Sequence, residues 1–312
     1  MPDSPIGVLL MAMGGPDSLE AVGPYLNDVR GGRPTPPELI EEITERYRAT
    51  GGKSPVLAIT KELAKRLEGR LNAAGAPRFK VYVGLRHWHP YIRETYRDIV
   101  KDGVRRVVGL CMAPQNSRMS VGAYIKKVEE AQAESALPVA FTYVPSWNMH
   151  PMLIQAITAN IREALQKFPA DVRPRVPILF TAHSLPESIL KDNDPYPREV
   201  RGTVDAVVAA ARPETWRFAF QSQGRSSEPW IGPTVEDTLD ELHALGHRHV
   251  LVAPIGFVSD HVEILYDIDI EFKKRAADKG MQLERIAMLN ATSPFVATLT
   301  DVVTSHLKET GS

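Results

Sequence analysis

The chain is predicted to fold as an α/β protein with two Rossmann-like lobes, each a four-stranded parallel sheet flanked by helices. Apolar strand-like runs alternate with amphipathic helical stretches along the whole sequence, and the runs are apolar on both faces. Such strands are typical of parallel sheets covered by helices on both sides. Because four runs precede and four follow the stretch 145–151, we expect two lobes with a ligand-binding cleft between them.

The elements follow in order along both lobes. The predicted N-terminal lobe spans residues 1–148 and the C-terminal lobe spans residues 149–312. Strands are expected at 7–13, 79–85, 107–113 and 139–144, and then at 176–182, 216–220, 249–255 and 283–289. Helical patterns lie at 92–100, 152–168, 235–245 and 264–277. An insertion at 19–75 separates the first two strands, with helices predicted at 37–47, where prolines favour a helix start, and at 59–71.

Composition excludes several classes of protein. A formal net charge of −1 disfavours nucleic-acid binding and polybasic membrane docking. The single cysteine, Cys111, lies in an apolar strand and cannot supply a disulfide or a four-thiolate iron–sulfur cluster. The first apolar run is preceded by no basic segment and ends in glycines, so we expect a strand rather than a signal peptide. No run is long enough to span a membrane, and we expect a cytoplasmic protein.

His183 ends the apolar run that starts at Val176. The carboxyl ends of parallel strands are where open α/β sheets bind ligands. Two interpretations stand at this point: a satisfied core histidine, or a residue that handles protons or a metal.

A row of carboxylates follows the strand at 249–255. Glu263, Asp267 and Glu271 are spaced to share one face of an α-helix. Like charges at that spacing repel, and no lysine is interleaved. The row is either a solvated acidic face or, with His183 in the same lobe, a site for a divalent transition metal.

A donor-rich loop spans residues 48–55, within the insertion. Its glycines and basic side chains indicate either a surface turn between helices or a clamp for carboxylates.

Several longer motifs resemble the ferrochelatase family. They are Leu179 to Pro186 with Asp194 to Pro197, Gln221-Ser222, Pro229 to Pro233, Pro254 to Asp267, Met13 to Pro16, Arg46-Tyr47 with Gly51 to Pro55, and Gly84 to His87 with Pro90. The resemblance covers nearly the whole chain in the same order. The chain is therefore identified as similar to ferrochelatases.

The resemblance implies an enzyme, a lyase that inserts ferrous iron into a porphyrin in haem biosynthesis. His183 and Glu263 would be the catalytic, metal-binding and proton-handling pair, with either metal ligation or proton acceptance as the main role of His183. Asp267 and Glu271 would extend a track for metal or protons. Substrate contacts would come from Met13, Arg30, Arg46, Tyr47, Ser54 and Tyr124.

The resemblance also implies a substrate and partners. Coproporphyrin III is favoured, because arginines in the insertion suit four propionates and the insertion lacks an apolar lip, although Met13 is more typical of protoporphyrin-using members. Fe2+ would be a substrate, with no tightly bound cofactor, no iron–sulfur cluster, no stable membrane insertion and a monomer favoured. The alternatives are a protoporphyrin IX ferrochelatase, a cobalt- or sirohydrochlorin-type chelatase, or a non-enzymatic two-lobe binding protein.

Overall fold

The computed structural model describes residues 4–73, 75, 77–224 and 228–311, and divides into two compact units. The first unit contains the chain up to Trp147 together with the segment from Asn290 onward, and the second unit is Asn148–Leu289. The predicted boundary at residue 148 differs from this division for the C-terminal segment. That segment carries helix α11 (Ser293–Thr310), which packs on α3 and β4 of the first unit.

The first unit is built on a parallel sheet of four strands in the order β2-β1-β3-β4. The strands are β1 (Ile6–Ala12), β2 (Phe79–Leu85), β3 (Arg106–Cys111) and β4 (Ala140–Val144). Its helices are α1 (Val22–Val29), α2 (Pro37–Ala49), α3 (Val56–Asn72), α4 (Ile92–Lys101), α5 (Ala123–Ala133) and α11, and a short π-helical turn, η1 (Arg118–Gly122), precedes α5. All four strand predictions for this lobe are confirmed, and so are the insertion helices, each with slightly different ends.

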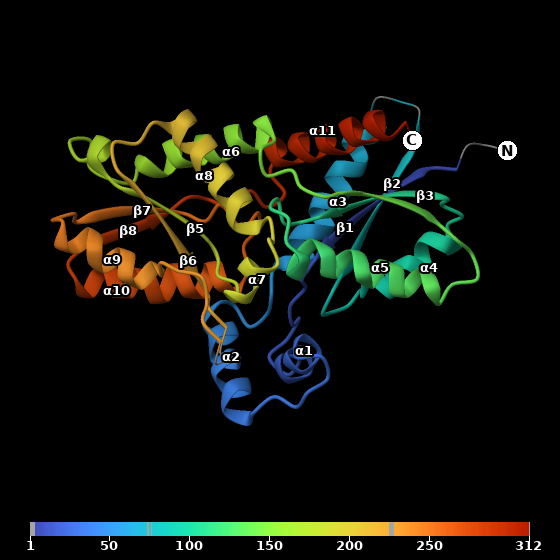
Figure 1. The fold of residues 1–312 in the computed structure, drawn as a ribbon, viewed down its shortest axis with the longest axis horizontal. Helices are drawn as coiled ribbons and strands as arrows, with labels where there is room; N and C mark the ends of the chain where they lie inside the picture. Colours follow the sequence, from blue (N-terminus) through green and yellow to red (C-terminus); the bar gives the residue numbers. More distant parts are fainter. Residues whose placement is uncertain (1–3, 74, 76, 225–227, 312) are drawn as a thin grey trace. The chain divides into compact units, whose positions relative to one another are not determined.

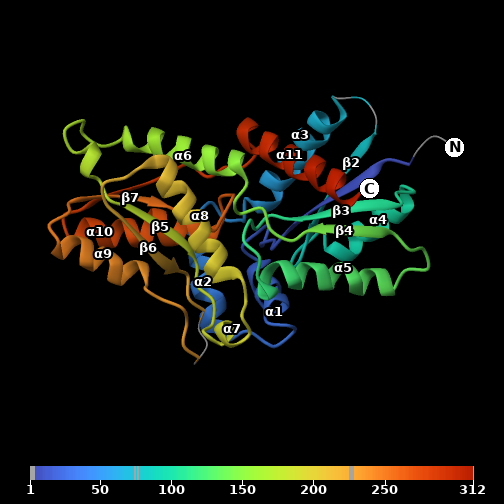
Figure 2. The same cartoon turned by 45° about the horizontal axis from the view of Figure 1, so that its top comes forward.

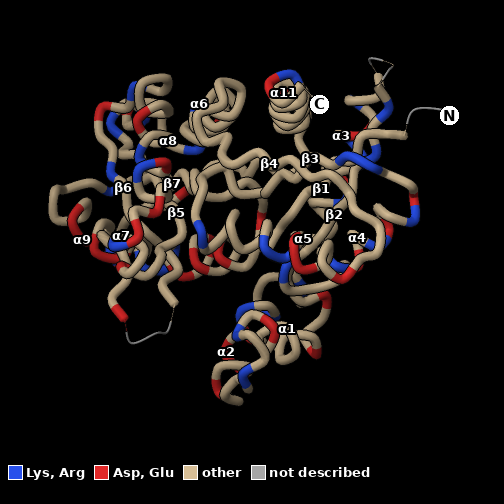
Figure 3. The backbone as a smooth tube through the Cα atoms, turned by 45° about the vertical axis from the view of Figure 1, so that its right-hand side comes forward, with Lys and Arg blue, Asp and Glu red and all other residues tan. Residues whose placement is uncertain are grey.

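Helices cover both faces of the first sheet. Figures 1 and 2 show α3 and α11 on one face and α4 and α5 on the other. Every residue of β1 is buried, as expected for a central strand of a parallel sheet. The core under α4 and α5 joins Leu9 and Val107 of the sheet to Ile92, Tyr96 and Val128 of the helices. Helix α2 carries basic and acidic residues side by side (Figure 3).

The second unit repeats this plan with strand order β6-β5-β7-β8, again all parallel. The strands are β5 (Ile178–His183), β6 (Trp216–Gln221), β7 (His249–Ala253) and β8 (Gln282–Arg285). Helical segments are α6 (Pro151–Leu165), η2 (Arg173–Arg175), α7 (Ser188–Lys191), α8 (Tyr196–Ala211), α9 (Val235–Ala244), η3 (Glu263–Phe272) and α10 (Lys273–Asp278). The α/β fold class and the four strands predicted here are confirmed, but the last of them, predicted at 283–289, ends at Arg285, four residues earlier than expected.

The second sheet is also covered on both faces, by α6 and α8 on one side and by α9, η3 and α10 on the other (Figure 1). The core below η3 joins Leu179 and Val252 to Ile264, Ile268 and Phe272. One prediction was wrong: 263–272 is a π-helix, with α-helix only over 273–278. Apolar spacing cannot distinguish the two forms, because both bury residues about four apart.

Gly256 lets the loop after β7 lie directly against β5. Its backbone amide donates to the carbonyl of Thr181 at 3.2 Å. A Cβ at this position would lie 2.6 Å from the Cβ and 2.8 Å from the Cα of Ala182. The neighbour is rigid strand backbone, so any side chain here would push the loop away from the sheet.

We therefore expect Gly256→Ala to lower the free energy of unfolding by about 1–3 kcal/mol, the usual cost of overpacking. Gly69→Ala is the matched control, since Gly69 lies on the exposed side of α3 and a Cβ there meets nothing within 4 Å. It should raise stability by about 0.5–1 kcal/mol. Urea unfolding of both variants checks the pair, and equal effects on stability would contradict the close approach.

His87 lies in the loop after β2 and contacts Asp28 of α1. Its Nδ1 lies 2.7 Å from the carboxylate of Asp28. The pKa of His87 is nevertheless lowered, because burial penalises the charged imidazolium more than the hydrogen bond with Asp28 favours it. The unfolded chain thus binds a proton at this residue more readily than the folded chain.

The stability that His87 contributes should accordingly be complete above the usual histidine pKa of about 6.5 and be lost as the pH falls below it. We expect the melting temperature to fall between pH 7 and pH 5, and to fall less in His87→Asn, which keeps a donor for Asp28. Thermal unfolding of both proteins at the two pH values measures this. An identical pH dependence would rule out His87 as a source.

Candidate functional site

His183 is the last residue of β5, which pairs with β6 and β7. Its Nδ1 lies against the backbone carbonyl of Ser184, which can only accept a hydrogen bond. The neutral ring therefore carries its proton on Nδ1 and keeps a lone pair on Nε2. The side chain is only partly buried. Its Nε2 can accept a proton or bind a metal ion, unlike the nitrogen of a fully satisfied core histidine.

Glu263, the first residue of η3, lies against a second histidine. The Nε2 of His261 is 3.4 Å from the Glu263 carboxylate, and both side chains are mostly buried, with 17% and 25% exposed. The Nδ1 of His261 is 2.9 Å from the carbonyl of Ser259 and must donate to it. A hydrogen bond between His261 and Glu263 therefore requires one further proton, on Nε2 or on the carboxyl group. The pair can hold and release a proton.

Gln221 connects the strand that carries His183 to the helix that carries Glu263. It stands opposite His183 at the end of β6, and its side-chain amide is buried. The amide oxygen accepts a hydrogen bond from the hydroxyl of Thr181 at 2.6 Å. The amide nitrogen donates to the backbone carbonyl of Glu263 at 3.0 Å. One side chain thus sets the position of the start of η3 relative to β5.

The ring of Phe257 adds an apolar contact between the two histidines. Its centroid is 4.6 Å from that of His261 and 6.3 Å from that of His183. The second sheet therefore brings two imidazoles and the Glu263 carboxylate to the same carboxyl-terminal edge, where parallel sheets bind ligands.

The predicted acidic row does not form one uniform stripe. Asp267 is buried and accepts a hydrogen bond from the hydroxyl of Ser222 at 2.6 Å. Glu263 is partly buried and Glu271 is exposed. The π-helix explains the difference, since its wider turn changes the angular offset between residues four apart. Segments of π-helix occur frequently at functional sites, and ten residues is a long one.

In the first unit, three of the predicted substrate residues lie around the turn after β1. The side chain of Met13 is 41% exposed. A Cβ at Gly15 would lie 2.4 Å from the Ser54 hydroxyl and 3.5 Å from that of Tyr47. The amide of Ser54 also donates to the carbonyl of Pro16 at 2.8 Å. Glycine at position 15 is what allows the donor-rich loop to reach this turn.

Tyr124 lies close to Arg86, and the backbone of Arg86 is hydrogen-bonded to the end of β1. It is buried at the start of α5, and the guanidinium of Arg86 lies 6.0 Å from the centre of its ring. The backbone amide of Arg86 donates to the carbonyl of Ala12, the last residue of β1. Burial raises the pKa of Tyr124, so its phenol stays protonated and can donate.

The arginines predicted to bind carboxylates are placed differently from one another. Arg30 follows α1, and its buried Nε has no hydrogen-bond partner within the described structure. Arg46 lies 3.4 Å from Glu42, one turn earlier in α2, and Arg48 pairs with Glu45 in the same way. A ligand carboxylate at Arg46 would therefore compete with a glutamate of the same helix.

Three further residues of the second-unit site carry no role predicted from the sequence. His261 precedes Glu263 by two residues, and its proximity in the sequence was the available signal. Gln221 and Ser222 stand in a matched motif, but only the sheet order places them beside η3.

Nowhere in the described ranges do three or more His, Cys, Asp or Glu side chains form a group able to hold a metal ion.

The chain is similar to known proteins over nearly its full length. A family model described as ferrochelatase matches residues 5–307. The chain is 46% identical over 299 residues to a ferrochelatase of Herpetosiphon aurantiacus, covering 96% of this chain and 98% of the relative. It is 36% identical over 305 residues to a coproporphyrin III ferrochelatase of Oceanobacillus iheyensis, covering 97% of each.

Solved structures agree on the fold. The structure of SirB from Bacillus subtilis with Fe3+ matches 97% of this chain and 95% of its own, with a TM-score of 0.60 at 11% identity. No helix within the described residues is both long and apolar enough to cross a membrane. The family model and the relatives together show that this chain belongs to the ferrochelatase family, lyases that insert iron into porphyrins.

Proposed function

We propose that this protein inserts ferrous iron into coproporphyrin III, with His183 and Glu263 of the second unit as the pair that handles metal and pyrrole protons. The observation that carries the proposal is that His183 and the His261–Glu263 pair lie at the same carboxyl-terminal edge of the second sheet. Imidazole and carboxylate donors suit ferrous iron. Fe2+ and the porphyrin are both substrates.

Each of these groups would accept one of the protons that the reaction releases. Insertion releases two pyrrole protons, and the lone pair on Nε2 of His183 would take one. The His261 and Glu263 pair has room for one proton between its facing atoms. Holding a macrocycle bent, with its nitrogens exposed, would favour the transition state over the flat substrate. Asp267 and Glu271 would extend the acidic path along η3.

The first unit would supply the substrate contacts. Met13 would lie against the porphyrin, and Ser54 and Tyr47 would donate to propionates at the turn after β1. Arg30, Arg46 and Tyr124 would add further contacts to propionates or the ring edge. The exposure of Met13 and the unpaired Nε of Arg30 support this assignment.

We propose that no resident cofactor takes part. The single thiol that could ligate a cluster, Cys111, is buried in β3, and burial raises its pKa to about 12. Such a thiol stays protonated at neutral pH and is a poor metal ligand.

Replacing either member of the pair should reduce turnover under anaerobic conditions. His183→Ala should lower kcat about 10²–10⁴-fold, the usual contribution of a general base. Glu263→Gln should lower kcat while the porphyrin Kd changes less than about threefold, since the carboxylate does not hold the ring. His243→Ala and Glu241→Gln, both on α9 of the same unit, are the matched controls and should keep wild-type kcat. Absorbance of the iron porphyrin and fluorescence quenching give the two readouts.

Wild-type turnover in His183→Ala would show that the imidazole is structural. Porphyrin binding with no iron insertion by the wild-type protein would instead favour a binding protein. Insertion of cobalt into sirohydrochlorin in preference to iron into a porphyrin would favour a cobalt- or sirohydrochlorin-type chelatase.

The preferred porphyrin is tested by kcat/KM for coproporphyrin III and protoporphyrin IX. Relatives at 36–37% identity named coproporphyrin III ferrochelatase support the first, and Met13 is the residue that favours the second. We expect a higher kcat/KM for coproporphyrin, and a smaller preference at high salt because exposed guanidinium–carboxylate attraction is screened. A tenfold preference for protoporphyrin would overturn this choice of substrate.

A further inference from the structure

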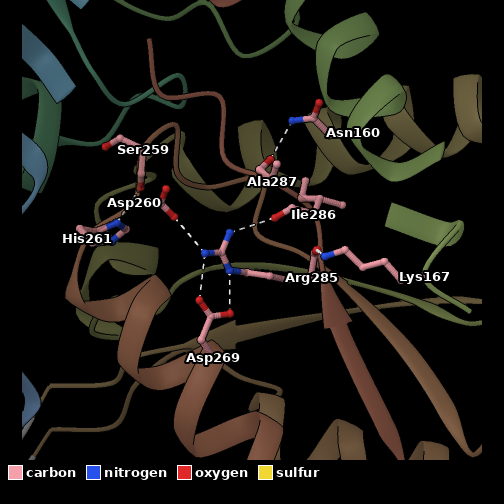
Figure 4. Close-up of polar contacts among 9 residues, drawn as sticks. All are labelled: Asn160, Lys167, Ser259, Asp260, His261, Asp269, Arg285, Ile286 and Ala287. Carbon is pink, nitrogen blue, oxygen red and sulfur yellow. Dashed lines mark hydrogen bonds and ion pairs between the residues drawn. The ribbon is translucent and has the colours of Figure 1, made fainter. Parts of the chain in front are cut away.

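Arg285, the last residue of β8, makes an ion-pair cluster that no part of the proposed mechanism uses. Its Nε and one terminal nitrogen form a bidentate pair with Asp269, at 2.8 and 2.9 Å. The same terminal nitrogen donates to Asp260 at 3.0 Å, and the other donates to the carbonyl of Ile286. Figure 4 shows the guanidinium between the two carboxylates. Four of its five N–H groups are therefore engaged.

The cluster joins three segments of the second unit. Arg285 belongs to β8, which is fixed in register to β7 at Val252. Asp260 belongs to the loop that leads from β7 into η3, and Asp269 lies within η3 itself. A planar, five-donor group is suited to hold two carboxylates in fixed directions, which a lysine cannot do.

Arg285 and Asp260 are largely shielded from water, whereas the side chain of Asp269 is 36% exposed. The side chain of Arg285 is 16% exposed and that of Asp260 is 22% exposed. Burial alone would lower the pKa of Arg285, but the hydrogen bonds and charges of Asp269 and Asp260 outweigh it and raise the pKa. The guanidinium is therefore charged throughout the accessible pH range. Removing it would take from Asp269 and Asp260 the guanidinium with which both form ion pairs.

The other flank of η3 is held from the opposite edge of the sheet. Gln221, at the end of β6, bonds the carbonyl of Glu263, and Ser222 bonds the carboxylate of Asp267. Since β6 and β8 are the two outer strands, η3 is anchored from both edges. The Arg285 anchor adjoins His261, because Asp260 is the residue before it.

We propose that Arg285 is a positioning residue, which keeps η3 and the loop before it in the orientation that presents Glu263 and His261. This inference rests on the proposed role of Glu263. Arg285 does not itself touch substrate; it acts through the backbone of the loop and of η3.

The test compares Arg285→Met with Arg275→Met, which removes another bidentate pair of the same unit, with Asp240 on α9. We expect Arg285→Met to lower kcat for iron insertion at least tenfold while KM for the porphyrin changes less than threefold. Arg275→Met should keep kcat within twofold. A kcat within threefold of wild type in Arg285→Met, or equal losses in both variants, would overturn the proposal.

Combination with Glu263→Gln separates positioning from general destabilisation. If Arg285 acts through Glu263, then Arg285→Met should lower kcat less than threefold further in that background. A full tenfold additional loss would mean that Arg285 acts elsewhere. Should Arg285→Met fail to fold, Asp260→Asn keeps the bidentate pair with Asp269 and removes the charge of the second carboxylate. It should lower kcat at least threefold with KM unchanged, whereas Asp240→Asn should not.

Amide hydrogen exchange gives a readout that does not depend on iron insertion. Arg285→Met should speed exchange over residues 261–268 at least tenfold, and Arg275→Met should leave those amides unchanged. If the wild-type protein inserts no iron, the proposed function is refuted. If amide exchange in Arg285→Met is unchanged, the positioning role of Arg285 is refuted.

Discussion

The buried amide of Gln221 is the interaction on which the polar site of the second unit depends. It accepts from Thr181 on β5 and donates to the backbone of Glu263, so two segments far apart in sequence share one side chain. An amide buried without these partners would cost free energy, so the contact is maintained once the sheet forms. The direction of His183 relative to η3 follows from it, together with the close approach of Gly256 to Ala182.

The first unit uses glycine for a similar purpose. The turn after β1 contains Gly14 in a left-handed conformation, with φ of 91°, and Gly15 in close contact with Ser54. Any side chain at Gly15 would displace the Ser54 loop from the strand end. Thus in each unit a glycine lets a second segment approach the end of a strand.

Much of this was predictable because it rests on local pattern. Most of the eight strands are short apolar runs, and a buried parallel strand needs little else. The exception is β8, Gln282–Arg285, in which only Leu283 is apolar. His183 and Glu263 could be chosen as candidates because the first ends such a run and the second comes after one, and the family motifs added their chemistry. Asn193 adopts a left-handed φ of 52°, a conformation that asparagine tolerates. The roles of the site residues themselves stay predictions.

The remainder depends on tertiary contacts that no local pattern encodes. The π-helical form of η3 has the same apolar spacing as an α-helix, so its effect on Asp267 and Glu271 was missed. Helix α11 packs on the first unit although it follows the second in sequence. Arg285 ends β8, and nothing in the strand's sequence indicates its partners. Asp260 and Asp269 come close to it only because the loop after β7 and η3 pack beside β8.

The protonation of His183 tests the central claim most directly. Nitrogen-15 NMR of histidine-labelled protein, with His183→Gln to assign the signals, distinguishes the protonated ring nitrogen from the bare one. We expect a proton on Nδ1 and a bare Nε2, and we expect Nε2 to shift when Zn2+, a diamagnetic substitute for ferrous iron, is added. A proton on Nε2 at neutral pH, or no response to the metal, would contradict the assignment of His183 as acceptor or ligand.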